Sequence, residues 1–127
     1  MGGGEAVTRL AIGFGASSTA TVEEVRALIE ATLARIGRAP SLLATLDRRA
    51  ALGEAVARSL GLELRLYPPE TLASIEGVRT HSCRSLAAAK TPSVAEAAAL
   101  AALGPEARLL EPRRLGPNST CALAEAP

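Results

Sequence analysis

Residues 7–25 read VTRLAIGFGASSTATVEEV and contain the transition that decides the fold. The first half is mostly apolar up to Phe14, which predicts a short strand over residues 7–14 followed by a glycine-rich turn. Thr21 and Glu24 then have the spacing of a capping box, in which each side chain accepts a hydrogen bond from the other's main-chain N–H. A helix is therefore expected to begin at once, and a strand followed directly by a helix is typical of α/β proteins.

The same alternation of strand and helix continues along the chain. Five short strands are expected from their apolar or alternating residues, and they lie at residues 7–14, 42–46, 63–67, 108–110 and 120–123. The intervening helices predict parallel pairing, whereas the last two strands are close enough to form an antiparallel hairpin. The sequence therefore predicts an α/β fold: a single domain over residues 1–127, with a mixed, mostly parallel sheet, helices on both faces, a C-terminal β-hairpin and a disordered segment at residues 1–6.

Composition excludes several classes of function. The 127 residues include 14 basic and 13 acidic side chains, so the net charge of +1 lacks the positive excess that general nucleic-acid binding requires. No apolar run reaches the roughly 20 residues of a membrane helix, and residues 1–5 lack the basic and apolar parts of a secretory signal. We therefore expect a cytoplasmic protein that binds neither nucleic acid nor membrane, with Cys83 and Cys121 reduced.

Four polar groups are predicted to lie where ligands bind in open α/β sheets, beyond the carboxyl ends of strands and near helix N-termini. One is the glycine-rich turn after the first strand, and another follows the second strand. A third begins the alanine-rich helix, and the fourth is a basic turn bounded by proline and glycine. The candidate ligand-binding residues are Gly13, Phe14, Gly15, Ser17, Ser18, Thr45, Asp47, Arg48, Ser93, Glu96, Arg113 and Arg114.

Each of these groups also has a purely structural explanation. Glycines serve a tight turn between strand and helix, and Asp47 can cap the helix that follows it. Ser93 and Glu96 have the spacing of a second capping box. Arg113 and Arg114 can simply occupy an exposed loop. On the residues alone, a binding site and a set of structural roles both remain open.

The motifs of common cofactor sites and catalytic centres are incomplete. The glycine turn begins like a dinucleotide-binding fingerprint, but Ser18 stands where the third glycine belongs, and no Gly-Lys-Ser/Thr sequence follows. His81 is the only histidine, and with Cys83 and Cys121 it makes too few ligands for a zinc site. We therefore expect no metal and no cofactor. If the protein is an enzyme, His81 or Asp47 is expected to act as its acid or base.

Several segments together resemble a known family, the CobE/CbiG C-terminal family of cobalamin biosynthesis. The segment TPSVAEAAAL is the most specific match, and it precedes a strand, a basic segment and a final strand, in the family's order. The resemblance rests on residues 10–18, 43–49, 91–100, 110–114 and 119–124. It therefore extends over essentially the whole chain.

The resemblance implies a part in cobalamin biosynthesis. In CbiG proteins this module is the C-terminal part of a longer chain that opens the lactone ring of a cobalt-precorrin and releases acetaldehyde, whereas the stand-alone form belongs to the aerobic route. Three functions stay open. One is a protein that binds or carries a corrin or precorrin intermediate, with other pathway enzymes as further partners. Another is a pathway enzyme acting on a precorrin, such as a lactone-opening hydrolase. The third is an assembly factor that contacts pathway enzymes rather than the corrin.

The physical chemistry of a corrin intermediate favours the binding protein. Such a molecule carries carboxylates around an apolar macrocycle, so its site needs separated anion receptors around an apolar floor. The helix starts at Ser17-Ser18 and Ser93 and the three arginines of the list are expected to be the receptors. Phe14 and the leucine and alanine surface are expected to supply the floor.

Overall fold

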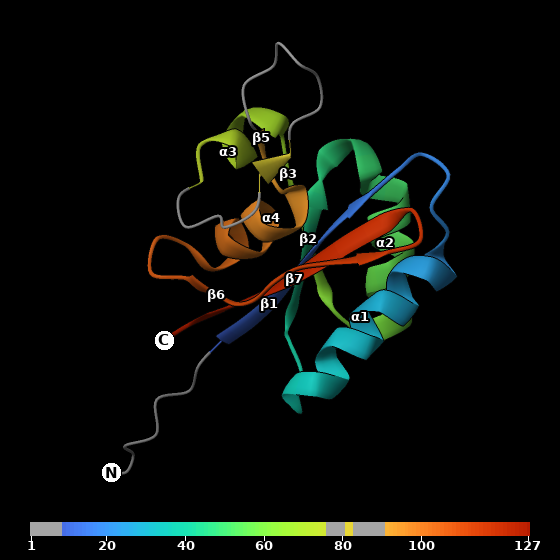
Figure 1. The fold of residues 1–127 in the computed structure, drawn as a ribbon, viewed down its shortest axis with the longest axis horizontal. Helices are drawn as coiled ribbons and strands as arrows, with labels where there is room; N and C mark the ends of the chain where they lie inside the picture. The colour runs from blue at the N-terminus through green and yellow to red at the C-terminus, as the bar shows by residue number, and fades with distance from the viewer. Residues whose placement is uncertain (1–8, 76–80, 83–90) are drawn as a thin grey trace.

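The computed structural model describes residues 9–75, 81–82 and 91–127 and shows a five-stranded sheet between two layers of helices (Figure 1). The strands of this sheet are β1 (Arg9–Ala16), β2 (Leu42–Leu46), β3 (Glu63–Tyr67), β6 (Arg108–Gly116) and β7 (Ser119–Ala126). The helices are α1 (Val22–Ile36), α2 (Ala50–Leu60), α3 (Pro69–Ala73) and α4 (Val94–Leu103), with a 3₁₀ turn η1 (Asp47–Arg49). Two short strands, β4 (His81–Ser82) and β5 (Thr91–Pro92), pair with each other.

The sheet has the strand order β3-β2-β1-β7-β6. The β1–β2 and β2–β3 pairs are parallel, whereas β7 runs antiparallel to both β1 and β6. The predicted α/β class, the mixed sheet, the helices on both faces and the C-terminal hairpin are therefore confirmed. The parallel share is smaller than predicted because β7 returns along β1. Residues 1–6 lie outside the described part of the chain, in which no helix is long and apolar enough to cross a bilayer.

Helix α1 begins and ends at the residues that the sequence indicates. The Thr21 hydroxyl accepts from the Glu24 N–H at 3.1 Å, and the Glu24 carboxylate accepts from the Thr21 N–H at 3.0 Å. These bonds satisfy two N–H groups that a helix start otherwise leaves unpaired. Gly37 ends the helix in the left-handed conformation, with φ of 73°. The capping box therefore forms, and it fixes the length of the loop between β1 and α1.

Strand β1 places large side chains on one face of the sheet and small ones on the other. Ile12 and Phe14 are fully buried against the α1 and α2 layer, where Val25 contributes to the same core. Ala11 packs with Ala99 on the opposite side, against α4. This division follows from the alternation of side chains along a strand, and it lets α4 approach the sheet more closely than α1 does.

Gly13 makes the approach of α4 possible. A Cβ atom at this position would overlap the main-chain oxygen of Ala95 and lie only 2.6 Å from the main-chain nitrogen of Ala99. The helix backbone therefore rests directly on the strand, and any side chain at Gly13 would push the two apart. This contact fixes the first turn of α4 beside the carboxyl end of β1.

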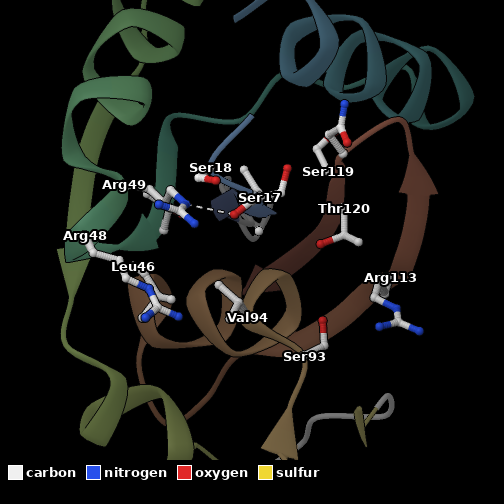
Figure 2. A pocket seen from close by; sticks show the side chains of 14 residues that line it. Ser17, Ser18, Leu46, Arg48, Arg49, Ser93, Val94, Arg113, Ser119 and Thr120 are labelled. Atoms are coloured by element: carbon white, nitrogen blue, oxygen red, sulfur yellow. Dashed lines mark hydrogen bonds between the residues drawn. The ribbon is translucent and has the colours of Figure 1, made fainter. Parts of the chain in front are cut away.

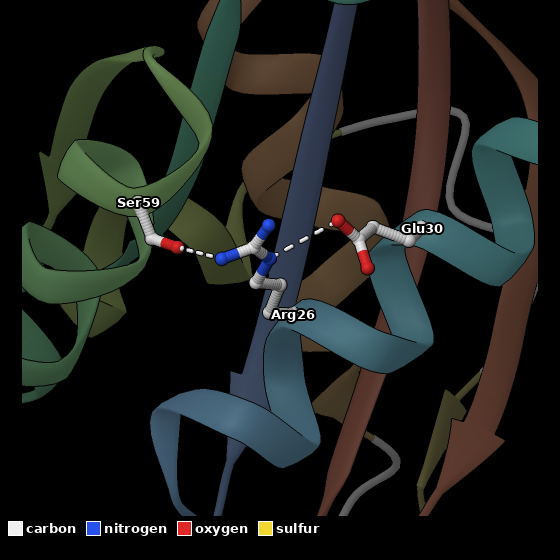
Figure 3. A network of polar contacts seen from close by, with 3 residues as sticks. All are labelled: Arg26, Glu30 and Ser59. Carbon is white, nitrogen blue, oxygen red and sulfur yellow. Dashed lines mark hydrogen bonds and ion pairs between the residues drawn. The ribbon is translucent and has the colours of Figure 1, made fainter.

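The α1 and α2 layer carries a polar link on its exposed side (Figure 3). Arg26 donates from Nε to Glu30 at 3.0 Å and from Nη1 to the Ser59 hydroxyl at 2.6 Å, which connects α1 to α2. Exposed ion pairs of this kind contribute little to stability because water competes for both partners. The layer depends mainly on buried apolar residues such as Val56.

The sequence predicts a turn at the basic segment before the last strand, and this prediction is wrong. Strand β6 continues to Gly116, so Arg113 and Arg114 lie on the strand, and the reversal is made by Pro117 and Asn118 instead. Asn118 adopts a φ of 58°, a conformation that asparagine tolerates better than most residues. The β6–β7 register shifts twice between Leu109 and Arg114, around Pro112, which cannot donate to the ladder.

The α4–β1 contact predicts that replacing glycine by alanine costs more stability at Gly13 than at Gly53. Gly13→Ala is expected to lower the free energy of unfolding by about 1–3 kcal/mol, because the new methyl group meets main-chain atoms that cannot move aside. Gly53→Ala in α2 meets only the side-chain ends of Leu64 and Thr45 at 3.2 Å. Its gain in helix propensity should keep it within about 1 kcal/mol of wild type. Urea unfolding measures both, and equal costs would contradict the close packing inferred at Gly13.

Candidate functional site

A cavity of about 520 Å³ lies at the carboxyl ends of β1 and β2, beside the first turn of α4 (Figure 2). In an open α/β sheet ligands bind at this end, beside the strand from which later strands are added on both sides. That strand is β1, with β2 on one side and β7 on the other. The antiparallel β7 also starts here, because Thr120 pairs with Gly15. The residues that line the cavity are Gly15, Ala16, Ser17, Ser18, Thr45, Leu46, Arg48, Arg49, Ser93, Val94, Arg113, Asn118, Ser119 and Thr120.

The cavity brings together residues from all four polar groups of the sequence. The candidates found in its lining are Gly15, Ser17, Ser18, Thr45, Arg48, Ser93 and Arg113. Thr45 is fully buried, and its hydroxyl donates to the Phe14 carbonyl oxygen at 2.8 Å. This bond joins the ends of β1 and β2 and gives the cavity a fixed base.

Phe14 and Gly13 do not reach the cavity. The Phe14 side chain is fully buried in the core on the α1 side of the sheet, because strand alternation turns it away from α4. It therefore cannot form the apolar floor expected of it. Leu46 and Val94 supply the apolar part of the lining instead, and Gly13 lies covered beneath α4.

Glu96 lies buried behind the lining rather than in it. Its side chain is fully buried, and Oε2 accepts a hydrogen bond from the main-chain N–H of Arg113 at 2.8 Å. Ser93 caps α4 by accepting from the Glu96 N–H at 3.4 Å. Glu96 thus holds β6 against the first turn of α4, so its role in this structure is to position Arg113.

The other candidates lie apart from the cavity lining. Asp47 is exposed on η1. Arg114 pairs with Cys121 across the hairpin and interacts electrostatically with its thiol, on the face opposite Glu96. Burial raises the pKa of the Cys121 thiol, although the Thr32 hydroxyl at 3.1 Å opposes the shift.

His81 lies on the short strand β4, and its side chain is outside the described part of the structure, as is Cys83.

The list of candidate ligand-binding residues drawn from the sequence leaves out Arg49, although the second polar group contains it, and the start of β7. Arg49 donates from Nε to the Ala16 carbonyl oxygen at 2.8 Å, which brings the side chain across to the end of β1. Ser119 and Thr120 line the cavity because β7 pairs antiparallel with β1 in this register. The basic run after β2 was a signal for Arg49, whereas nothing local indicates the β1–β7 register.

The described lining is strongly cationic. Arg48, Arg49 and Arg113 contribute guanidinium groups, and none of the described lining residues is acidic. Figure 2 shows Arg48 and Arg49 on one side of the cavity, with Arg113 and Ser93 on the other. The first turn of α4 adds the positive end of its helix dipole. Guanidinium groups and N–H donors in this arrangement suit a ligand with several carboxylate or phosphate groups.

Comparison with known proteins identifies the family. Residues 10–124 match the family described as "Cobalamin synthesis G C-terminus". The match covers nearly the whole chain, so the chain belongs to this family, and the resemblance noted in the sequence is confirmed. A comparison with curated proteins finds no match.

Solved structures agree with this assignment. The chain is similar to CobE, a protein from the cobalamin (vitamin B12) biosynthetic pathway, with 32% identity over 94% of this chain and 92% of that one, and a TM-score of 0.81. It is also similar to the cobalamin biosynthesis protein chiG from Agrobacterium tumefaciens str. C58, with 28% identity, coverages of 91% and 96%, and a TM-score of 0.66. A cobalamin biosynthesis protein G homolog from Sulfolobus solfataricus shares the fold, with 21% identity and a TM-score of 0.71. The match covers 94% of this chain and 37% of that longer one.

Removing the Glu96 carboxylate should separate its structural role from its charge. Glu96→Ala leaves the buried N–H of Arg113 without this acceptor, so the free energy of unfolding should fall by about 1–3 kcal/mol. Glu96→Gln retains an amide oxygen that can accept the same bond and should lose clearly less. Urea unfolding of both variants provides the comparison. If glutamine costs as much as alanine, the hydrogen bond to Arg113 is not what Glu96 contributes.

Proposed function

We propose that the chain binds a corrin or precorrin intermediate of cobalamin biosynthesis in the cavity, and that it holds or carries this molecule rather than transforming it. The proposal rests above all on one observation: cationic groups stand on opposite sides of a cavity whose lining also contains the apolar side chains of Leu46 and Val94 (Figure 2). Membership of the cobalamin synthesis G C-terminal family supports the choice of ligand. Other enzymes of the pathway, which supply and receive the intermediate, are the protein partners we propose.

The chemistry of the lining matches the periphery of a corrin. The macrocycle carries carboxylates on flexible arms, and a guanidinium group can bind a carboxylate through two parallel hydrogen bonds. Arg113 on one side and Arg48 on the other are placed to receive separate arms. Leu46 and Val94 offer apolar contact to the ring between them. The cavity is partly open to solvent, so we propose that it receives one edge of the macrocycle.

The chemistry of the lining also supports binding over catalysis. Its described ionisable side chains are arginines, which stay protonated at neutral pH and do not serve as acid or base. Serine and threonine hydroxyls need an adjacent base to become nucleophiles. The alternative, a precorrin hydrolase, would require His81 or Asp47 to approach the ligand. Asp47 is exposed and outside the lining.

The first test is a titration of the purified protein with hydrogenobyrinic acid, a metal-free corrin polycarboxylate. Absorbance reports binding, and mass spectrometry of the recovered ligand reports any reaction. We expect a stoichiometric spectral change with unchanged ligand mass. A changed mass would make the protein an enzyme and direct mutagenesis to His81. A flat titration would contradict the corrin site.

A variant of one receptor tests the placement of that site. Arg113→Gln removes one charge-assisted contact, each of which contributes roughly 1.5–3 kcal/mol, so Kd should rise by about 10- to 100-fold. Arg35→Gln is the control, because Arg35 is exposed in the last turn of α1 and lies outside the cavity lining. Equal affinity of the Arg113→Gln protein and the wild type would move the site away from this wall.

A further inference from the structure

Arg49 differs from the other lining arginines in how it is held. It ends the η1 turn after β2, and its Nε–H donates to the carbonyl oxygen of Ala16, the last residue of β1, at 2.8 Å. The acceptor is a main-chain atom of a strand paired on both sides. The bond therefore ties the side chain to one of the most rigid parts of the cavity, across 33 residues of sequence.

The bond through Nε leaves the outer end of the guanidinium group available. Arginine has five N–H donors in a rigid plane, and four of them are on the two terminal nitrogens. Among the described residues, no side chain or carbonyl accepts from Nη1 or Nη2 of Arg49. Figure 2 shows the guanidinium group reaching toward the middle of the cavity. The two terminal nitrogens together match the two oxygens of a carboxylate.

Arg48, the neighbouring residue, shows what this tether changes. It also lines the cavity, but its side chain is exposed. A free arginine loses rotamer entropy when it binds a ligand, which weakens the net contribution of the contact. Arg49 has already given up part of that freedom because its Nε–H is bonded to the Ala16 carbonyl oxygen. A contact to Arg49 therefore retains more of its binding energy than a contact to Arg48.

We infer that Arg49 receives one carboxylate of the bound molecule end-on and makes the site selective for the free acid over the carboxamide at that position. The inference rests on the proposed function and adds to it the residue that determines specificity. A carboxamide presents one acceptor oxygen and one NH₂ group. The NH₂ group would face a guanidinium N–H, so two donors would be left opposite each other without an acceptor.

The test compares two ligands on each protein: hydrogenobyrinic acid and the same corrin with its carboxylates converted to carboxamides. The readout is the ratio of the two Kd values. Since both ligands are measured on one preparation, any loss of folded protein affects both values equally. Wild-type protein should bind the acid at least about 100-fold more tightly than the amide, as expected for the loss of charge-assisted hydrogen bonds.

Two substitutions at Arg49 separate its geometry from its charge. Arg49→Gln should weaken binding of the acid by about 10- to 100-fold and reduce the acid-to-amide ratio by a similar factor. Arg49→Lys keeps the charge but loses the planar pair of donors, so it should restore only part of the ratio. Arg48→Gln should change the ratio less than Arg49→Gln, and Arg35→Gln should leave it unchanged.

The outcomes distinguish this inference from the proposed function. If wild-type protein binds neither ligand, the proposed function and this inference are both overturned. If wild-type protein binds the acid and the ratio stays the same in Arg49→Gln, the inference is overturned and the proposed function stands. A full restoration of the ratio by Arg49→Lys would also overturn it, because charge alone would then explain the selectivity.

Discussion

The direct contact between the backbone of α4 and strand β1 at Gly13 is the constraint on which the rest of the structure depends. It places the first turn of α4 beside the carboxyl end of β1, and Glu96 then joins that turn to β6 through the Arg113 N–H. The walls of the cavity formed by β1, α4 and β6 are thus positioned by contacts that involve main-chain atoms. Contacts of this kind need no large side chains, which suits a protein with an aromatic content of 2%.

Much of the fold could be predicted because its signals are local. The bounds of β2 and β3 follow from apolar runs and alternation, and α1 from its capping box and terminal glycine. The last two strands were predicted too short, and Arg113 and Arg114 were assigned to a turn. Strand β6 is held in place by its pairing with β7, and its bulges around Pro112 interrupt any simple pattern. The residues next to β6 in the sequence therefore do not indicate how long the strand is or where it ends.

The site was predictable as a place more than as a set of contacts. Polar residues at the ends of neighbouring parallel strands converge at one end of a sheet, which is why Ser17 and Thr45 meet in the cavity lining. Ser93 joins them because α4 packs against β1 at Gly13. Which way a side chain points depends on the face it occupies. Phe14 faces the core on the α1 side, and Arg49 crosses to Ala16 through a bond between distant residues. The family resemblance predicted the family of the chain, but it did not predict the directions in which these two side chains point.

The irregular course of β6 also affects how the protein behaves beside copies of itself. This strand is one edge of the sheet, and a regular edge is a template for pairing with another chain. Pro112 offers no donor there, and the register shifts on either side of it bend the edge out of line. An incoming strand would find a broken ladder after only a few residues. The irregular edge that helps to place Arg113 therefore also protects concentrated protein against aggregation through this side of the sheet.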